Sequence, residues 1–454
     1  MLRTVALLIL LSALTGCVST AYTNVKTNHT YTQKDSRATY TITRDRGKHK
    51  EALAILALSG GGSRASYWSA AIMFALEELY TDEELDILGE IDVITSVSGG
   101  GLPAAYYAIS YPDNDESAEL RKRVWEKTLV KELMAKPYRT IWLWRWLWPQ
   151  NIARYWFTSF DRSDIMAQVF ADHLYDRKRS GTNLRFKDVN PERPYLIMNA
   201  TSGTRGSFGD HFAFTHEQFR KLDSDIEEYE IAKGVMASAS FPAIFHSVTL
   251  KDFMKYPDKQ EHFLHLMDGG IKDNFGFNTI EELLKKNIER YDRVVIIVVD
   301  AHTDSDGASD TQRDTRSLSD YIIDKNAMDS INIMLADTRD ILMKDFKEGL
   351  KKYRDKQVLY YHIQFNDAGL IAEDLELAGR LDKISTDFNL EPVETAQSDI
   401  DSAVRLLIVK ENLCLENIKR IFLDKEPQII GGAACTWPPK KDEGVTDRTP
   451  SILP

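Results

Sequence analysis

The 454-residue sequence has no run of basic residues, no internal repeat and only three cysteines. Its 57 basic residues are outnumbered by 69 acidic ones, so the net charge is −12 and a nucleic acid is not an expected partner. The main body also lacks long low-complexity linkers, which favours one elaborated domain over a multidomain chain. Because 43% of the residues are hydrophobic, that domain can have a large core.

No hydrophobic run near the N-terminus is long enough to span a bilayer. The compact apolar segment Val5–Leu11 follows a short positive start, Met1-Leu2-Arg3, and small residues lead on to Cys17. This order is typical of the signal peptide of an exported protein. Leu14-Thr15-Gly16-Cys17 resembles the lipobox of bacterial lipoproteins. The resemblance implies that residues 1–16 are removed and that Cys17 is acylated, which would anchor the chain to a membrane.

An ordinary secretory signal with an incidental cysteine is the alternative to this lipoprotein signal. Val18, in the place of an aspartate, resembles the sorting signal of enteric lipoproteins for the outer membrane. We therefore expect a lipid-anchored protein of the bacterial cell envelope, at the outer membrane. Residues 17–50 would form a polar tether, with ends roughly 30 Å apart as a flexible coil. Within it, Ala38–Thr43 alternates like an edge strand.

The other two cysteines, Cys414 and Cys435, lie near the C-terminus. Export would place them in an oxidising compartment, where a disulfide between them would hold the C-terminal tail. Two free thiols are the alternative, because the sequence does not show whether the two Cα atoms lie within about 7 Å of each other.

Two glycine-rich turns each follow an apolar run and precede a stretch suited to a helix. The first turn, Ser59–Arg64, follows Ala52–Leu58, and the second, Ser96–Gly101, follows Ile91–Thr95. The apolar runs predict buried strands, and a strand, a tight turn and a helix in this order are typical of a catalytic corner. The second turn can present a serine at a helix N-terminus, and the first can offer backbone N–H groups to an oxyanion.

Ser98 is the candidate nucleophile of the second turn. Its neighbours Ser96, Gly99 and Gly100 are small, as a sharp turn from strand to helix requires. The usual elbow has a glycine where this chain has Ser96, which is a mild departure. The alternative for this turn is a phosphate-binding corner or simply a tight connection between a strand and a helix.

Asp268 is the candidate base. It ends the predicted strand Phe263–Met267 and is followed by two glycines, so it can approach a serine hydroxyl closely. A serine hydroxyl needs such a base, because it is a poor nucleophile while it keeps its proton. Alone, the Asp-Gly-Gly sequence is also a common turn signal.

Taken together, these motifs resemble the patatin-like phospholipases. The motifs are Gly60-Gly61-Gly62-Ser63-Arg64, Ser98-Gly99-Gly100, Asp268-Gly269-Gly270 and, between the last two, the stretch Ala237–Phe245. The resemblance covers about residues 52–301. It implies a serine–aspartate dyad in which Ser98 attacks an acyl ester and Asp268 acts as the base. It also implies an oxyanion hole formed by Gly60, Gly61, Gly62 and Arg64, in which Arg64 mainly orients the loop and secondarily contacts an anionic head group.

No motif indicates a metal or another cofactor, and none is expected. None of the ten histidines lies in a motif typical of a catalytic triad. His262 and His265 are three residues apart on a predicted strand, so they would point to opposite faces and share a metal poorly. The acidic loop 300–307 lacks the glutamate that closes an EF-hand loop, which favours a solvated turn over a calcium site.

Four of the eight tryptophans lie close together, at Trp142, Trp144, Trp146 and Trp148. Tryptophan is favoured at the headgroup level of a bilayer, so a membrane-facing lid or an acyl-chain groove is one interpretation. A buried aromatic cluster beneath a helical insertion is the other.

The expected organisation is a signal peptide at 1–16, an acylated tether at 17–50, a patatin-like domain at 51–426 with a helical, aromatic-rich insertion at about 116–188, and an irregular tail at 427–454. The expected fold is a three-layer α/β/α sandwich with helical insertions. The expected function is a membrane-anchored phospholipase or lysophospholipase that acts on phospholipid or lysophospholipid through an acyl-enzyme. The alternatives are an acyltransferase and a lipid- or partner-binding lipoprotein whose catalysis has decayed, for which Ser96 is the support.

Overall fold

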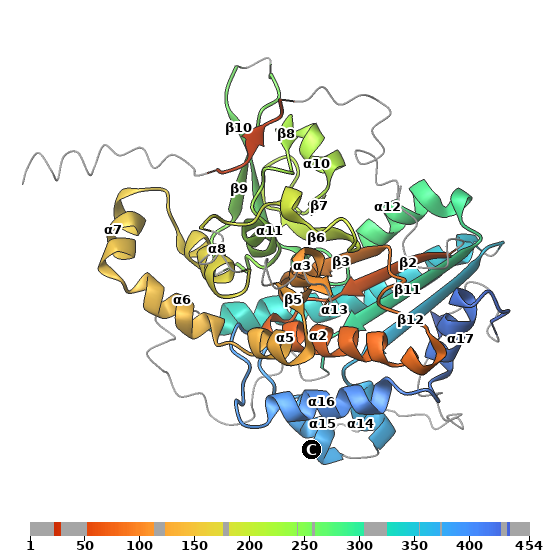
Figure 1. Cartoon of the computed structure of the whole chain (residues 1–454). Coiled ribbons are helices and arrows are strands. Elements are labelled where there is room, and N and C mark those ends of the chain that lie inside the picture. The colour runs from red at the N-terminus through yellow and green to blue at the C-terminus, as the bar shows by residue number, and fades with distance from the viewer. Residues whose placement is uncertain are drawn as a thin grey trace, which may run out of the picture.

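The computed structural model describes residues 22–28, 52–112, 123–175, 181–242, 244–256, 259–303, 325–353, 355–372, 375–427 and 434–435. These residues form a large mixed sheet with helices packed on both of its faces (Figure 1). Cys17, the expected signal peptide, the predicted strand at 38–43 and residues 304–307 of the acidic loop lie outside the described residues.

In the described part of the chain, the strands of the main sheet run in the order β13-β12-β11-β2-β3-β6-β10-β9, and β7 pairs with β6. Neighbouring strands from β13 to β6 are parallel, whereas β10 is antiparallel to both β6 and β9. The bounds are β2 Ala52–Leu58, β3 Val93–Val97, β6 Tyr195–Ser202, β7 His211–Ala213, β9 Val248–Asp252, β10 His262–Asp268, β11 Arg293–Asp300, β12 Gln357–Gln364 and β13 Ala434–Cys435.

The central strands are apolar on both sides, as the sequence of β2 illustrates. Leu53, Ile55 and Ala57 pack into the core on one face of the sheet, and Ala54 and Leu56 pack into the core on the other. Successive residues of a strand point to opposite faces, so a continuous apolar run is what a sheet covered on both faces requires.

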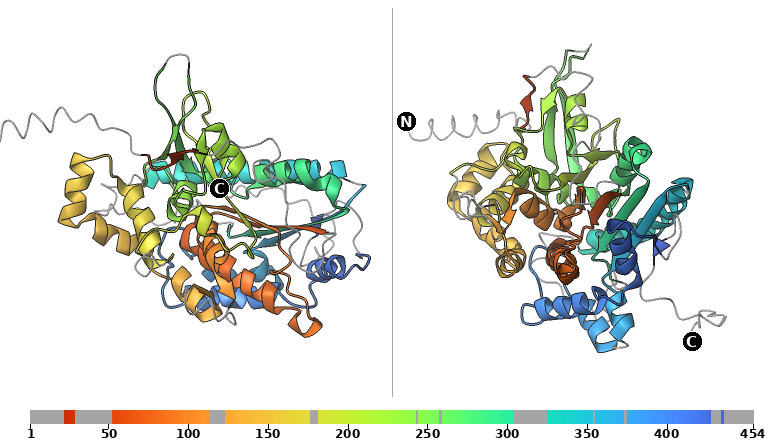
Figure 2. Two further views of the ribbon diagram at one scale, coloured as in Figure 1. Left: turned by 45° about the horizontal axis from the view of Figure 1, so that its top comes forward. Right: turned by 45° about the vertical axis from the view of Figure 1, so that its right-hand side comes forward.

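Helices α12 (Phe277–Asn287) and α13 (Lys325–Leu350) cover one face, through residues such as Leu283 and Phe346. The other face carries α2 and α3 and most of the remaining helices (Figures 1 and 2). Their bounds are α2 Gly62–Glu78, α3 Gly101–Ile109, α5 Lys127–Met134, α6 Tyr138–Trp146, α7 Pro149–Phe157, α8 Arg162–His173, α10 His216–Lys221, α11 Ile231–Ser238, α14 Asp367–Ala372, α15 Leu375–Leu381, α16 Ala396–Leu407 and α17 Leu413–Phe422. The predicted three-layer α/β/α fold is confirmed.

The insertion between β3 and β6 is largely helical where it is described. It contains α5 to α8 and a small pair of parallel strands, β4 (Tyr111–Pro112) and β5 (Val124–Trp125). Helices α6 and α7 project from the body at the left of Figure 1.

The two ends of the chain contain short strands that the sequence did not indicate. Residues Val25–Lys26 form β1, which pairs antiparallel with β8 (Ser224–Asp225), so part of the expected tether is joined to the body. The tail was expected to be irregular from residue 427, and this is wrong at β13, which adds a parallel strand beside β12. No helix among the described residues is long and apolar enough to cross a membrane.

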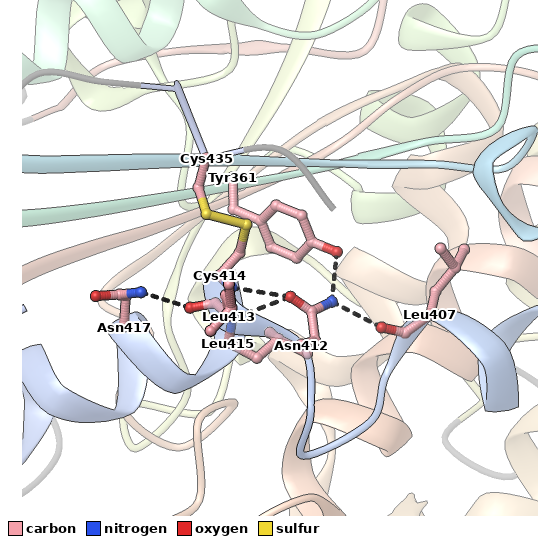
Figure 3. Close-up of a disulfide and its surroundings, with 8 residues drawn as sticks. All are labelled: Tyr361, Leu407, Asn412, Leu413, Cys414, Leu415, Asn417 and Cys435. Carbon is pink, nitrogen blue, oxygen red and sulfur yellow. Dashed lines mark hydrogen bonds between the residues drawn. A yellow bond between two sulfur atoms is a disulfide. The ribbon is translucent and has the colours of Figure 1, made fainter. Parts of the chain in front are cut away.

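A disulfide joins Cys414 of α17 to Cys435 of β13, with their Cα atoms 5.6 Å apart (Figure 3). Asn412 caps α17 by accepting hydrogen bonds from the N–H groups of Cys414 and Leu415. Its side-chain amide also donates to the hydroxyl of Tyr361 on β12 over 2.8 Å. The disulfide therefore fixes β13 to α17, and α17 is itself held against the sheet by Asn412.

Candidate active site

Ser98 lies at the sharp turn that follows β3. Its φ is 47°, a left-handed conformation that non-glycine residues seldom adopt. Residues Ser98–Gly100 form one short 3₁₀ turn, and α3 begins at Gly101. A residue held in this conformation presents its side chain away from the strand and helix that flank it, which is the geometry of a nucleophile elbow.

The small residues of the elbow are required by contact with the first glycine turn. A Cβ atom on Gly99 would lie 2.0 Å from the carbonyl oxygen of Gly62, and one on Gly100 would lie 2.6 Å from that of Ser59. A Cβ on Gly60 would lie 3.2 Å from the Cβ of Ser98. The two turns, separate in the sequence, therefore pack backbone to backbone around the serine.

Ser96 is accommodated without displacing its neighbours. Its hydroxyl is fully buried and donates to the carbonyl of Ile197 over 3.4 Å. A Cβ on Gly101 would still lie 3.7 Å from that hydroxyl, which is an ordinary contact. The serine at this position therefore leaves the elbow intact, and its hydroxyl is bonded to Ile197 while Asp268 is bonded to Ser98 and Gly270.

Ser98 and Asp268 are in direct contact. The Ser98 hydroxyl donates to Oδ2 of Asp268 over 2.9 Å, and the other carboxylate oxygen accepts the N–H of Gly270 over 2.8 Å. Strand direction explains the approach. Strand β10 runs antiparallel to β6, and its last residue, Asp268, pairs with Ala200. Because the preceding residue of β6, Asn199, pairs with Val97 at the end of β3, Asp268 lies close to the turn that carries Ser98.

Burial raises the pKa of Asp268 to about 6, although the hydrogen bonds from Gly270 and Ser98 act in the opposite direction. At neutral pH the carboxylate is therefore ionised and more basic than an exposed aspartate. In the described part of the chain no histidine is hydrogen-bonded to either residue. Asp268 can therefore take the proton of Ser98 directly, without a histidine between them.

The glycine loop Gly60–Gly62 was predicted to form the oxyanion hole, and the structure removes Gly60 from that set. The N–H of Gly60 is committed to Asn274, whose side-chain oxygen lies 3.2 Å away, so Gly60 is not an available oxyanion donor in this structure. Gly61 and Gly62 have φ values of 135° and 55° and are the N-cap and the first residue of α2, where backbone N–H groups lack intrahelical acceptors. Among the described residues neither donates its N–H to another group. These two amides remain the candidate oxyanion hole.

Arg64 is buried and does not face an open site. It donates from Nη1 to the carbonyl of Ile384 over 3.0 Å, and its guanidinium lies 5.8 Å from the ring of Phe365. Its contacts join the glycine loop to a distant part of the chain. This arrangement agrees with the orienting role and leaves Arg64 outside the oxyanion hole.

The segment 384–391 was not indicated by any sequence motif, yet it packs on the glycine loop. Ser63 donates its N–H to the carbonyl of Asp387 over 2.7 Å, and a Cβ on Gly62 would lie only 1.7 Å from the Thr386 carbonyl. On its other side the segment holds α6, since Arg139 donates its N–H to the carbonyl of Phe388 over 3.0 Å. It therefore connects α6 to the start of α2.

Two further polar residues, Ser238 and Asn199, hold the elbow through hydrogen bonds. Ser238 accepts the N–H of Ser98 over 2.9 Å and donates to the carbonyl of Asn199 over 2.6 Å. The Asn199 side chain donates to the carbonyl of Ser96 and the hydroxyl of Thr95. Ser238 lies within the stretch Ala237–Phe245 already noted, but nothing in the sequence indicated which of its residues contacts the nucleophile.

The four clustered tryptophans divide into two pairs. Trp142 is buried, donates its N–H to the carbonyl of Arg162 and packs against Phe245, and the half-buried Trp146 stacks on it at 5.8 Å. Trp144 and Trp148 are exposed. The described residues contain no group of three His, Cys, Asp or Glu side chains that could hold a metal ion.

Comparison with known protein families now adds to this geometry. Residues 56–280 match the family model of the patatin-like phospholipases. Over these residues the chain belongs to the patatin-like phospholipase family. The segment includes both glycine turns, Ser98 and Asp268, as the resemblance of the motifs predicted. A search of curated proteins gave no match.

Three solved structures show a distant likeness to this patatin-like chain. A structure of human GIVD cytosolic phospholipase A2 is 13% identical, with a TM-score of 0.36, and the match covers 56% of this chain and 44% of that one. The human enzyme with a methyl γ-linolenyl fluorophosphonate inhibitor is 12% identical, with a TM-score of 0.40, over 86% of this chain and 64% of that one. VipD from Legionella pneumophila is 12% identical, with a TM-score of 0.30, over 83% and 67% of the two chains. Because these TM-scores are low, the assignment of the fold rests on the strand order and layers described above.

Proposed function

We propose that this patatin-like chain is a serine acyl-ester hydrolase of phospholipase A or lysophospholipase type, anchored to a membrane through an acylated Cys17. The observation that carries the proposal is the 2.9 Å hydrogen bond from the Ser98 hydroxyl to the ionisable carboxylate of Asp268, inside a family of phospholipases. Phospholipid and lysophospholipid are the proposed substrates.

In the proposed reaction the Ser98 oxygen attacks the carbonyl carbon of the acyl ester while its proton passes to Asp268. The carbonyl oxygen becomes an oxyanion, and the N–H groups of Gly61 and Gly62 stabilise it. When the intermediate collapses, the bond to the alcohol oxygen breaks and Asp268 returns the proton to that leaving group. The acyl chain is then an ester of Ser98.

The second half of the reaction uses the same groups with water as the nucleophile. Asp268 takes a proton from water, the resulting hydroxide attacks the acyl-enzyme, and the proton returns to the Ser98 oxygen as the fatty acid leaves. An alcohol in place of water would give acyl transfer, so the products identify which acceptor is used. A decayed binding protein is less favoured, because Ser96, its main support, leaves the dyad intact.

The location is proposed from the N-terminal sequence. Acylation of Cys17 after removal of residues 1–16 would place the protein in the bacterial cell envelope, at the outer membrane because Val18 follows the cysteine. Mass spectrometry of the N-terminal peptide tests this: a diacylglyceryl mass on Cys17 that is lost in Cys17→Ser supports the anchor, and an unmodified or internal Cys17 contradicts it.

A substrate panel tests the activity. Purified wild-type protein and Ser98→Ala are incubated with phospholipids, lysophospholipids and neutral glycerides, and the released fatty acid is measured. Release by wild type but not by Ser98→Ala supports the hydrolase. No turnover of any lipid would favour a binding role, and transfer of the acyl chain to an alcohol without fatty acid release would identify an acyltransferase.

A further inference from the structure

An apolar face on α6 and α7 has no partner in the described part of the chain. Four of its side chains, Trp144, Trp148, Trp156 and Phe157, are 71%, 66%, 73% and 71% exposed, and Leu147 and Ile152 lie among them. We call these six residues the aromatic face. Contiguous exposed apolar residues of this kind mark interaction surfaces in soluble proteins.

The exposed aromatic residues do not result from a helix that is loosely packed on the body. No residue of α7 is buried, although Ile152 and Trp156 lie four residues apart on one side of it and follow Trp148, its N-cap, at the same interval. In α6, by contrast, the inner side is fixed by Trp142, which packs against Phe245. Trp142 thus holds α6 against the body while the aromatic face stays exposed, and Figures 1 and 2 show α7 projecting from the body.

The position of Tyr22 puts the proposed anchor within reach of the same region. Tyr22 is held on the body by the rings of Phe253 and Phe263, at 6.1 and 5.7 Å, and it lines the same cleft as Tyr155 of α7. Cys17 lies five residues before Tyr22, and five residues span at most about 17 Å in any conformation. An acyl chain on Cys17 would therefore enter a bilayer within that reach of the cleft that α7 borders.

Charge also fits a lipid surface. The chain has a net charge of −12, yet no acidic residue occurs from Leu133 to Phe160. Within this stretch Arg145 is paired with Asp172, and the exposed Arg154 lies over the ring of Phe160 at 3.8 Å. An anionic bilayer would meet tryptophans and an arginine here, and no carboxylate of these two helices.

We propose that the aromatic face of α6 and α7 docks in the headgroup layer of the same membrane that holds Cys17, so that the chain is held at two points. The inference rests on the proposed acylation of Cys17. Tryptophan prefers this layer because its ring is apolar and its N–H can remain hydrated. Docking also fixes the orientation of the active site, because α6 is joined through the segment 384–391 to the start of α2.

Quenching by brominated lipid tests the docking without any requirement for catalysis. The full-length acylated chain carrying Ser98→Ala is placed in phosphatidylethanolamine–phosphatidylglycerol vesicles whose phospholipids are brominated near the top of the acyl chains. We expect loss of roughly one third of the tryptophan emission, since three of the eight tryptophans lie on the aromatic face. The combined variant Trp144→Ser, Trp148→Ser and Trp156→Ser should lose this quenchable fraction.

Ile341→Ser is the matched control, because Ile341 is an exposed apolar residue of α13, on the opposite face of the sheet. It should leave the quenching unchanged, and all variants should keep the wild-type circular dichroism. Absence of quenching in the Ser98→Ala chain, or equal quenching in the triple variant, overturns the proposal. So does a sedimentation result in which the triple variant converts a dimer to a monomer while lipid quenches neither protein, since a second copy would then cover the face.

In the active chain the triple variant should lower hydrolysis of vesicle phospholipid by about tenfold and leave hydrolysis of a soluble short-chain ester unchanged. An equal loss on both substrates would contradict a docking role. If wild type hydrolyses neither substrate, the proposed function fails, while the quenching result still decides the docking.

Discussion

Ser238 accepts the backbone N–H of Ser98 over 2.9 Å and donates its own hydroxyl proton to the carbonyl of Asn199 over 2.6 Å. All three residues are buried. One hydroxyl thus connects the end of β3, the middle of β6 and the end of α11. It satisfies the amide of a residue whose φ of 47° is itself unfavourable, so it stabilises the elbow in the conformation that faces Asp268.

Replacing Ser238 with alanine should therefore weaken both stability and catalysis. A buried N–H left without an acceptor costs about 1–3 kcal/mol, and we expect the free energy of unfolding to fall by this amount. Hydrolysis should fall by roughly tenfold, because the elbow loses its support. Urea unfolding and ester hydrolysis measure the two effects. Ser398→Ala, which removes an exposed hydroxyl in α16, should change neither, and a Ser238→Ala protein equal to wild type would show that this contact is dispensable.

The activity should depend on pH through Asp268. Its pKa is raised to about 6 by burial, and only the ionised carboxylate can take the serine proton. We expect kcat/KM for a soluble ester to rise with pH through about 6 and to level off above about 7. At pH 5 it should be about tenfold below the plateau. A rate that is already constant below pH 5, or that falls as pH rises through 6, would contradict Asp268 as the base.

Asp268→Asn should remove the catalytic base and so lower activity, but it should make the protein more stable relative to wild type as pH rises. In wild type the folded carboxyl binds its proton more tightly than the unfolded one, with a pKa of about 6 against 3.8, so this contribution to stability is complete below pH 3.8 and is lost as pH rises through 6. Asparagine has no such loss. The variant should therefore gain about 3 kcal/mol relative to wild type between pH 3 and pH 8, measured by urea unfolding at both values. A difference that does not vary with pH would show that Asp268 does not carry this buried charge.

The sequence predicted which residues form the site better than it predicted how the strands bring them together. Ser98 and Asp268 could be identified because each follows an apolar run and precedes glycines. The direction of β10 could not, and it is the antiparallel pairing of β10 with β6 that brings Asp268 to the end of β3. Gly60 was assigned to the oxyanion hole because it belongs to the glycine turn, but Asn274 takes its N–H.

The segment 384–391 was missed for a physical reason. Its contact with Ser63 is made by a backbone carbonyl, which every residue has, and the ion pairs of Arg139 with Asp387 and Glu391 join residues 248 and 252 positions apart, so no local side-chain pattern indicates them. The tryptophan cluster was left open between a buried and a membrane-facing arrangement, and the structure contains both, with Trp142 inside and Trp144 outside. Periodicity of apolar residues alone does not tell which side of a helix meets a protein partner.

The disulfide should stabilise the C-terminal part of the fold. Cys414 and Cys435 are separated by 21 positions, and closing a loop of this length restricts the unfolded chain by about 3 kcal/mol. The double variant Cys414→Ala and Cys435→Ala should unfold at lower urea by that free energy. Added reductant should destabilise wild type to the same level and leave the double variant unchanged. Equal stability of the two proteins under oxidising conditions would contradict a stabilising bond.

Labelling by a fluorophosphonate probe tests the central claim most directly, because the probe reacts only with a serine that has been activated as a nucleophile. Mass spectrometry of the labelled protein should find one equivalent on the peptide that contains Ser98. Ser98→Ala should not be labelled, and Asp268→Asn should be labelled several orders of magnitude more slowly than wild type while remaining folded. An unlabelled wild-type protein, or equal labelling of Ser98→Ala, would contradict Ser98 as the nucleophile.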